Sequence, residues 1–280
     1  MENVDPALDL DAYFRRIGYA GSRDATLEPL RALHALHPQA IAFENLNPML
    51  GWPVLLDQAS LQRKLVDQGR GGYCYEHNLL FGAVLRALGF KVTDLCGRVL
   101  WNAPSGHVNA RTHMLLRVDL DGEIWLADVG FGALTLTAPL KLQVDIAQTT
   151  PHEAFRIVQE AGAYRMEASI QDQWKPLYSF DLQPQLQADY EMANWYLSHH
   201  PASRFVTDLM AARVAQDFRY GLRGRQFSEH ARDGRVHRRV LANAAELRQL
   251  LQQTFLVRLG AEPELQALLD SVVAQPVLAP

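Results

Sequence analysis

Cysteine is scarce in this chain, which limits how the fold can be stabilised. Only Cys74 and Cys96 occur among 280 residues. Two cysteines cannot form the disulfide framework of a small secreted domain, and a chain of this length can bury a large core without one. We therefore expect a protein of the reducing cytoplasm.

Long apolar runs and a basic N-terminus are missing as well. No stretch approaches the ~20 apolar residues that span a bilayer. The first five residues include Glu2 and Asp5, whereas a secretory signal begins with basic residues. We expect neither a membrane segment nor a membrane partner.

The chain also lacks an excess of positive charge. Lys and Arg total 27 against 31 Asp and Glu, and the formal net charge is -4. Nucleic-acid binding depends largely on neutralising phosphates, so we expect no nucleic-acid partner. With 48% hydrophobic and 21% charged residues, the composition is that of a globular protein, and the length favours two or three packed units.

Apolar spacing and turn residues divide the chain into helical and strand-rich parts. Helices are predicted from Thr26 to a stop at Pro38, over about 58–68 behind a cap at 57, and over 74–88. Short strands from 91 to about 182 predict an antiparallel sheet or barrel.

The last ninety residues mix both patterns. Helical spacing returns after Asp189 and breaks at Pro201, and the Asp-Gly pair at 233–234 predicts a hairpin. Asn243 with Glu246 resembles a capping box that begins another helix. No repeat or long linker is present, so we expect closely packed units.

Cys74 is the first candidate for chemistry. It begins a predicted helix directly after a glycine-rich segment, where the helix dipole and unpaired amides favour the thiolate. Gly71 and Gly72 leave the sulfur accessible. Free cysteines are more often inert core residues, and we assign Cys96 to that class.

A predicted hairpin supplies a base and its orienting acceptor. If residues 121–122 form a two-residue turn, His113 and Asp128 lie on one face as diagonal neighbours, roughly 7–8 Å apart along the backbones. A four-residue loop over 120–123 keeps this register, whereas a three-residue loop would put the two side chains on opposite faces. The simpler interpretation is a satisfied strand histidine and a strand-end hydrogen bonder. Against it, Asp128 lies inside the predicted apolar strand 123–129, where an unpaired carboxylate is costly.

Other residue groups favour no competing chemistry. Cys74 and His77 form a C-x-x-H half-site without a second pair at zinc spacing, so no metal is expected. No dinucleotide or Walker motif occurs. A basic stretch is interpreted as a solvated face that a phosphorylated cofactor could use; it comprises Arg223, Arg225, Arg232, Arg235, Arg238 and Arg239.

The segment RGGYCYEHN at 70–78 resembles the R-G-G-[YFW]-C element of the arylamine N-acetyltransferase family. Three more segments resemble other family blocks: FENL at 43–46, RTHM at 111–114 and ADVGFG at 127–132. Their order and spacing agree, and further likeness at 11–14, 194–196 and 203–206 extends over most of the chain.

The resemblance implies an α+β fold with a cysteine-protease-like catalytic arrangement. Residues 1–90 would form an N-terminal helical bundle, 91–190 a central antiparallel β-barrel, and 191–280 an interdomain helix and α/β lid. The implied activity is ping-pong acetyl transfer from acetyl-CoA, as co-substrate, to an arylamine, arylhydrazine or hydroxyarylamine.

The resemblance also implies roles for individual residues. Cys74 would be the acylated nucleophile, His113 its base and Asp128 the acceptor that fixes the imidazole. Positions lining the family's acceptor pocket match Phe43, Val99, Phe131 and Phe205. Positions near the coenzyme match Trp101, Thr112, Gly130 and Gly132. Phe43 and Phe205 could equally be core residues, and Glu44 with Arg70 would form an ion pair that braces the cysteine loop.

Two other classes of function stay open. A thiol hydrolase or a transglutaminase-like acyltransferase would use the same three residues. Acylation of Cys74 by acetyl-CoA, rather than by a peptide or a glutamine amide, distinguishes the acetyltransferase from these enzymes. A catalytically silent binding protein is disfavoured because all three residues are present. The physiological amine, the preferred acyl-CoA and a homo-oligomeric state are not determined by the sequence.

Overall fold

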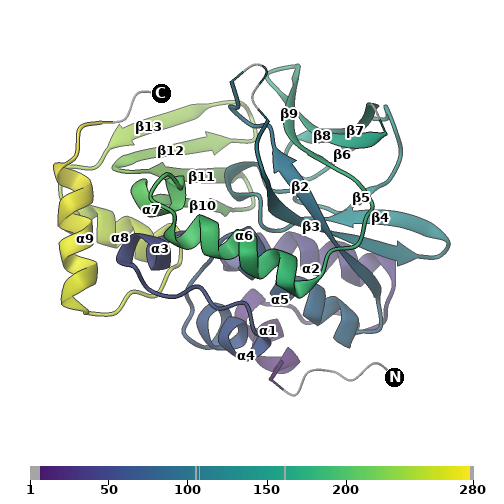
Figure 1. The fold of residues 1–280 in the computed structure, drawn as a ribbon, viewed down its shortest axis with the longest axis horizontal. Helices are drawn as coiled ribbons and strands as arrows, with labels where there is room; N and C mark the ends of the chain where they lie inside the picture. Colours follow the sequence, from purple (N-terminus) through teal and green to yellow (C-terminus); the bar gives the residue numbers. More distant parts are fainter. Residues whose placement is uncertain (1–6, 105, 107, 161, 278–280) are drawn as a thin grey trace.

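The computed structural model describes residues 7–104, 106, 108–160 and 162–277, which form three groups of elements. Figure 1 shows helices of the N-terminal group below, the barrel at upper right and the C-terminal sheet at upper left. The fold is α+β, as predicted. Residues 1–5, on which the prediction about a secretory signal rests, lie outside the described part. No helix in the described part is long and apolar enough to cross a membrane.

The N-terminal group is mainly helical. Its elements are α1 (Leu10–Ile17), α2 (Leu27–Ala40), β1 (Phe43–Glu44), α3 (Leu46–Leu50), α4 (Gln58–Leu61), the π-helix η1 (Gln62–Asp67) and α5 (Cys74–Ala87). The helix predicted over 58–68 is present as α4 and η1, and the Asp57 side chain caps it by accepting from the Ser60 amide.

The prediction that Pro38 ends its helix is wrong. α2 continues to Ala40 with Pro38 inside its last turn. A proline so close to the C-terminal end removes one amide from the helix, and the chain continues because the Ile41 amide still donates to the His37 carbonyl at 2.9 Å.

Residues 91–180 form a nearly closed eight-stranded antiparallel barrel. Its strands are β2 (Lys91–Val99), β3 (Arg111–Leu120), β4 (Glu123–Ala127), β5 (Leu140–Lys141), β6 (Gln148–Thr149), β7 (Ala154–Glu160), β8 (Ala163–Ile170) and β9 (Gln173–Phe180). A short 3-10 turn, η2 (Gly132–Leu134), follows β4. The edge strands β5 and β6 are joined through the Gln148 side chain, which bonds the Lys141 backbone twice at 2.8 Å.

The predicted register of the β3–β4 hairpin is confirmed. Leu120 pairs with Glu123 and Leu116 with Ala127. The predicted strand end at 129 is wrong, because the ladder stops at Ala127. Beyond it, helix side chains replace the strand partner: the Asp128 amide donates to His34 of α2, and the Val129 amide to Asn78 of α5.

The C-terminal group lies beside the barrel (Figure 1). It comprises α6 (Gln187–His199), α7 (Arg204–Thr207), β10 (Met210–Val214), β11 (Phe218–Arg223), β12 (Gln226–Ala231), β13 (Val236–Val240), α8 (Ala244–Gln253) and α9 (Pro263–Ala274). Strand β1 pairs with β10, so the five-stranded sheet includes a piece of the N-terminal group. The hairpin at 233–234 and the cap of α8 by Asn243 are confirmed.

A buried arginine fastens the C-terminal sheet to the barrel. Arg219 of β11, 4% exposed, donates to both carboxylate oxygens of Glu153 and to the Ala133 carbonyl at 3.1 Å. Glu153 precedes β7, so this contact joins two of the three groups. Removing the carboxylate would leave a buried guanidinium without its counter-charge.

We expect Glu153→Ala to reduce the free energy of unfolding by about 3 kcal/mol, measured by urea denaturation. The exposed pair Arg232–Asp217, with 3.8 Å between nitrogen and oxygen, provides the control. Arg232→Ala should change the stability by less than about 0.5 kcal/mol. Equal stability of both variants would show that Arg219 needs no carboxylate.

Candidate functional site

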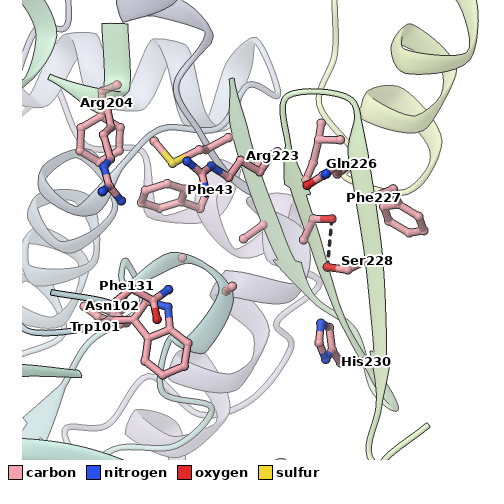
Figure 2. Close-up of a pocket in the computed structure, with 18 of the residues that line it drawn as sticks. Phe43, Trp101, Asn102, Phe131, Arg204, Arg223, Gln226, Phe227, Ser228 and His230 are labelled. Atoms are coloured by element: carbon pink, nitrogen blue, oxygen red, sulfur yellow. Dashed lines mark hydrogen bonds between the residues drawn. The ribbon is translucent and has the colours of Figure 1, made fainter. Parts of the chain in front are cut away.

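A cleft of about 700 Å³ lies where the three groups meet. Its lining includes Cys74, His113 and all eight residues that the family resemblance associated with the acceptor pocket or the coenzyme: Phe43, Val99, Trp101, Thr112, Gly130, Phe131, Gly132 and Phe205. Figure 2 shows Trp101 and Phe131 on one side and Ser228 and His230, from β12, on the other. The third predicted catalytic residue, Asp128, is 0% exposed and lies behind His113.

Cys74 is the first residue of α5, and the loop before it is tightly packed. A Cβ added to Gly71 would lie 2.0 Å from the Ala42 carbonyl oxygen, so only glycine permits this approach. The Glu76 carboxylate accepts from the Tyr73 amide at 3.0 Å, and the Cys74 sulfur lies 3.6 Å from the Thr112 carbonyl. The nucleophile candidate therefore sits on a fixed backbone at the cleft wall.

The predicted ion pair between Glu44 and Arg70 is confirmed. The two side chains are 2.8 Å apart, and the Glu44 carboxylate also accepts from the amide of Gly71. A second pair, Lys64 with Glu76 at 2.6 Å, holds the other side of the loop. Both carboxylates are almost fully buried, so each needs its cation.

His113 and Asp128 form a buried pair. Nε2 of His113 lies 2.8 Å from Oδ2 of Asp128, which leaves Nδ1 as the ring nitrogen available to Cys74. Burial acts to lower the pKa of His113, but the Asp128 carboxylate and a hydrogen bond with Cys74 raise it to about 10. Burial acts to raise the pKa of Asp128, but His113 holds it below its ordinary value. The pair is therefore an imidazolium and a carboxylate near neutral pH.

Two further donors orient the Asp128 carboxylate. Its Oδ1 accepts from Nδ2 of Asn78 and from the amide of Gly130, each at 3.0 Å. Gly130 is also a point of close approach, because a Cβ there would lie 2.9 Å from Cα of Cys74. Because residue 130 has no side chain, the turn at 128–130 can contact the start of α5.

Aromatic rings enclose the imidazole and line the cleft. The ring of His113 lies 4.7 Å from that of Tyr178 and 5.0 Å from that of Phe131, measured between centroids. Phe43 and Phe205 lie 6.1 Å apart on the cleft wall. The Tyr178 hydroxyl is buried, and burial together with the Asp128 charge raises its pKa well above the ordinary value. The environment excludes water from the pair and offers an apolar surface to a ring.

Asn78 and Tyr178 belong to the site, although no sequence pattern above identified them. Asn78 stands four residues after Cys74 and therefore on the same helix face, which is a signal that could have identified it. Tyr178 belongs to β9, and no local pattern places that strand beside β2. The basic stretch is divided by the fold: Arg223, Arg238 and Arg239 line the cleft, whereas the remaining three do not.

The C-x-x-H half-site does not have a free histidine. Both ring nitrogens of His77 lie within hydrogen-bonding distance of other groups: its Nδ1 faces Nε2 of His37, and its Nε2 faces two backbone carbonyls. No group of three or more metal-ligating side chains occurs within the described residues.

This arrangement suits covalent acyl transfer. A thiol at a helix N-terminus, an adjacent imidazolium and a carboxylate behind the imidazolium are the parts of an activated cysteine nucleophile. The cleft beside it combines aromatic walls with arginines, so it can take an apolar ring and a phosphorylated molecule.

Comparison with known proteins agrees with this chemistry. An N-acetyltransferase family model matches residues 26–263. An arylamine N-acetyltransferase of Mycobacterium tuberculosis is 42% identical over 96% of this chain and 97% of its own length. An arylamine N-acetyltransferase / N-hydroxyarylamine O-acetyltransferase of Salmonella typhimurium is 41% identical over 88% of each chain.

Solved structures show the same fold. The structure of Mycobacterium marinum arylamine N-acetyltransferase in complex with CoA has a TM-score of 0.91 and 43% identity to this chain, covering 94% of it and 99% of its own length. Since both the family model and the relatives extend over most of the sequence, this chain is an acyltransferase that belongs to the arylamine N-acetyltransferase family.

Proposed function

We propose that this protein transfers an acetyl group from acetyl-CoA, through a thioester on Cys74, to an arylamine, an arylhydrazine or a hydroxyarylamine. The single observation that carries the proposal is the buried His113–Asp128 pair beside Cys74 at the wall of an aromatic cleft. The CoA complex of the M. marinum relative supports acetyl-CoA as co-substrate.

In the first half-reaction the sulfur of Cys74, whose proton has passed to His113, attacks the acetyl carbonyl carbon. The new carbon–sulfur bond forms while the bond to the coenzyme sulfur breaks, and the coenzyme leaves as a thiol after taking a proton from the His113 imidazolium. Asp128 keeps the ring oriented and stabilises its positive charge whenever the ring is protonated.

In the second half-reaction the amine nitrogen attacks the Cys74 thioester. His113, now neutral, accepts the proton that the nitrogen loses, and the thiolate of Cys74 is restored beside the imidazolium. The same cleft serves both substrates in turn, because both must reach the sulfur of Cys74, which lines it.

We assign different lining residues of the cleft to the two substrates. Phe43, Val99, Phe131 and Phe205 would contact the acceptor ring, and Trp101, Thr112, Gly130 and Gly132 would lie along the coenzyme. Arg223, Arg238 and Arg239 of the C-terminal group add positive charge suited to coenzyme phosphates.

We also propose a division of labour among the three parts of the chain. Residues 1–90 supply the nucleophile, residues 91–190 supply His113 and Asp128, and residues 191–280 cover the cleft. The protein would act in the cytoplasm on small molecules, without nucleic acid or a membrane surface as partner.

Cys74→Ser should abolish turnover and leave the fold intact, because the hydroxyl is nearly isosteric but far less nucleophilic near neutral pH. Mass spectrometry after incubation with acetyl-CoA should find the acetyl group on residue 74 of the wild type only. Cys96→Ser is the matched control and should keep activity, since Cys96 is buried outside the cleft. Reversed behaviour of the two variants would refute the nucleophile assignment.

Asp128→Asn should strongly reduce acylation of Cys74, because the amide keeps the volume but loses the charge that stabilises the imidazolium. The corresponding change in a serine protease costs about 10⁴ in turnover, and the loss should be smaller here because sulfur is intrinsically more nucleophilic than a hydroxyl oxygen. Rapid-quench acylation measures the rate, and a cooperative thermal melt checks the fold. Acylation at the wild-type rate would leave a Cys74–His113 dyad as the better mechanism.

Initial rates at several fixed amine concentrations should give parallel double-reciprocal lines against acetyl-CoA, because the coenzyme leaves before the amine reacts. Intersecting lines would indicate a ternary complex. Acylation by a peptide or glutamine amide, but not by acetyl-CoA, would instead favour a thiol hydrolase or transglutaminase-like enzyme.

A further inference from the structure

Three buried side chains form a line of hydrogen bonds behind the cysteine loop. The Tyr13 hydroxyl of α1 lies 2.8 Å from Nδ1 of His37 on α2, and Nε2 of His37 lies 2.9 Å from Nδ1 of His77 on α5. All three residues are at most 1% exposed. The mechanism above assigns none of them a role.

The line ends on backbone carbonyls next to the site. Nε2 of His77 lies 3.1 Å from the oxygen of Gly72 and 3.2 Å from that of Ala42. Gly72 is two residues before Cys74, and its carbonyl also accepts from the Glu44 amide at 2.8 Å. His77 therefore bonds the point where β1 contacts the loop that leads to Cys74.

The carbonyl end sets the direction of each hydrogen bond. A carbonyl oxygen only accepts, so Nε2 of His77 carries the proton, and in the neutral ring its Nδ1 then accepts from Nε2 of His37. By the same rule Nδ1 of His37 accepts from the hydroxyl of Tyr13. The three side chains form a one-way relay that requires both imidazoles to be neutral.

The electrostatic surroundings support neutral rings. Burial lowers the pKa of His77 to about 4. Burial, with the neighbouring rings of His77 and His34, holds the pKa of His37 well below its ordinary value. The relay therefore keeps its direction at neutral pH, where His113 is charged.

The relay also contacts the acceptor side of the cleft. The rings of His77 and Phe43 are stacked, with centroids 6.4 Å apart and an interplanar angle of 10°. Phe43 lines the cleft. A shift of His77 would thus disturb both the cysteine loop and an aromatic wall.

We propose that Tyr13, His37 and His77 are positioning residues that hold the Cys74 sulfur against His113 by fixing the Gly72 carbonyl. The proposal rests on the proposed role of Cys74 as nucleophile. Catalytic groups must be held close to their reactive geometry, and a displacement of about 1 Å can cost up to ~10²-fold in rate.

The first test compares His77→Leu with His77→Gln. Leucine removes both hydrogen-bonding functions, whereas glutamine keeps a donor and an acceptor. The readout is the second-order rate of Cys74 alkylation by iodoacetamide at pH 7, with peptide mapping to separate Cys96. We expect a loss of about tenfold or more in His77→Leu and of less than about threefold in His77→Gln.

Leu33→Ala is the matched control for a purely structural effect. Leu33 is a fully buried residue of α2 that belongs to the same core but to no hydrogen bond of the relay, so its truncation destabilises the fold alone. Folded Leu33→Ala should be alkylated at the wild-type rate. A wild-type rate in His77→Leu, or equal losses in His77→Leu, His77→Gln and Leu33→Ala, would overturn the proposal.

If His77→Leu does not fold, Tyr13→Phe decides, because it removes a single hydroxyl. We expect a loss of about threefold in the alkylation rate, and a wild-type rate would overturn the relay.

Nitrogen NMR of the wild type should find the proton on Nε2 of His37 and His77, and a proton on Nδ1 of His77 would contradict the direction of the hydrogen bonds. Because alkylation needs no acetyl-CoA, a wild type that is alkylated but not acetylated would refute the proposed function alone.

Discussion

The buried ion pair between His113 and Asp128 is the constraint on which the rest of the site depends. A carboxylate that is 0% exposed is tolerated only when its lone pairs are satisfied and its charge is matched. Asn78, Gly130 and His113 together meet that requirement, and they come from α5, the turn after β4 and β3. The pair therefore needs the helical group and the barrel in one relative position, and that position places Cys74 beside the imidazole.

Close backbone approach is the second constraint, and glycine provides it at two points. Gly71 lets the cysteine loop cross the Ala42 carbonyl, and Gly130 lets the turn after β4 reach the start of α5. Neither contact leaves room for a Cβ. The glycines act on the site through distance: the Gly71 amide comes near enough to donate to the Glu44 carboxylate, and the turn after β4 comes near enough to α5 for the Asn78 side chain to donate to Asp128.

The sequence predicts those parts of the site that local rules control. The turn at 121–122 fixed the hairpin register, and the register places residues 113 and 128 on one face. The prediction failed where residues distant in sequence act. β4 ends two residues before the predicted end at 129, because His34 and Asn78 bond the amides of residues 128 and 129. Tyr178 and the division of the arginines depend on barrel closure and on packing of the C-terminal sheet, which neither periodicity nor turn chemistry encodes. The family resemblance indicated the pocket residues, which spacing alone would have left as core.

Four buried histidines in this core show how partners decide the state of one residue type. His113 faces a carboxylate and is held as a cation, whereas His34 accepts from the Asp128 amide and is held neutral, with its pKa lowered to about 4. His37 and His77 bond one another, and their other partners are the Tyr13 hydroxyl and two backbone carbonyls, so no carboxylate bonds either ring. Because Asp128 is the one carboxylate that bonds an imidazole among these four, the positive charge stays on the ring next to Cys74. The neutral rings of His34, His37 and His77 therefore leave the positive charge on His113, where it can stabilise negative charge on the sulfur of Cys74.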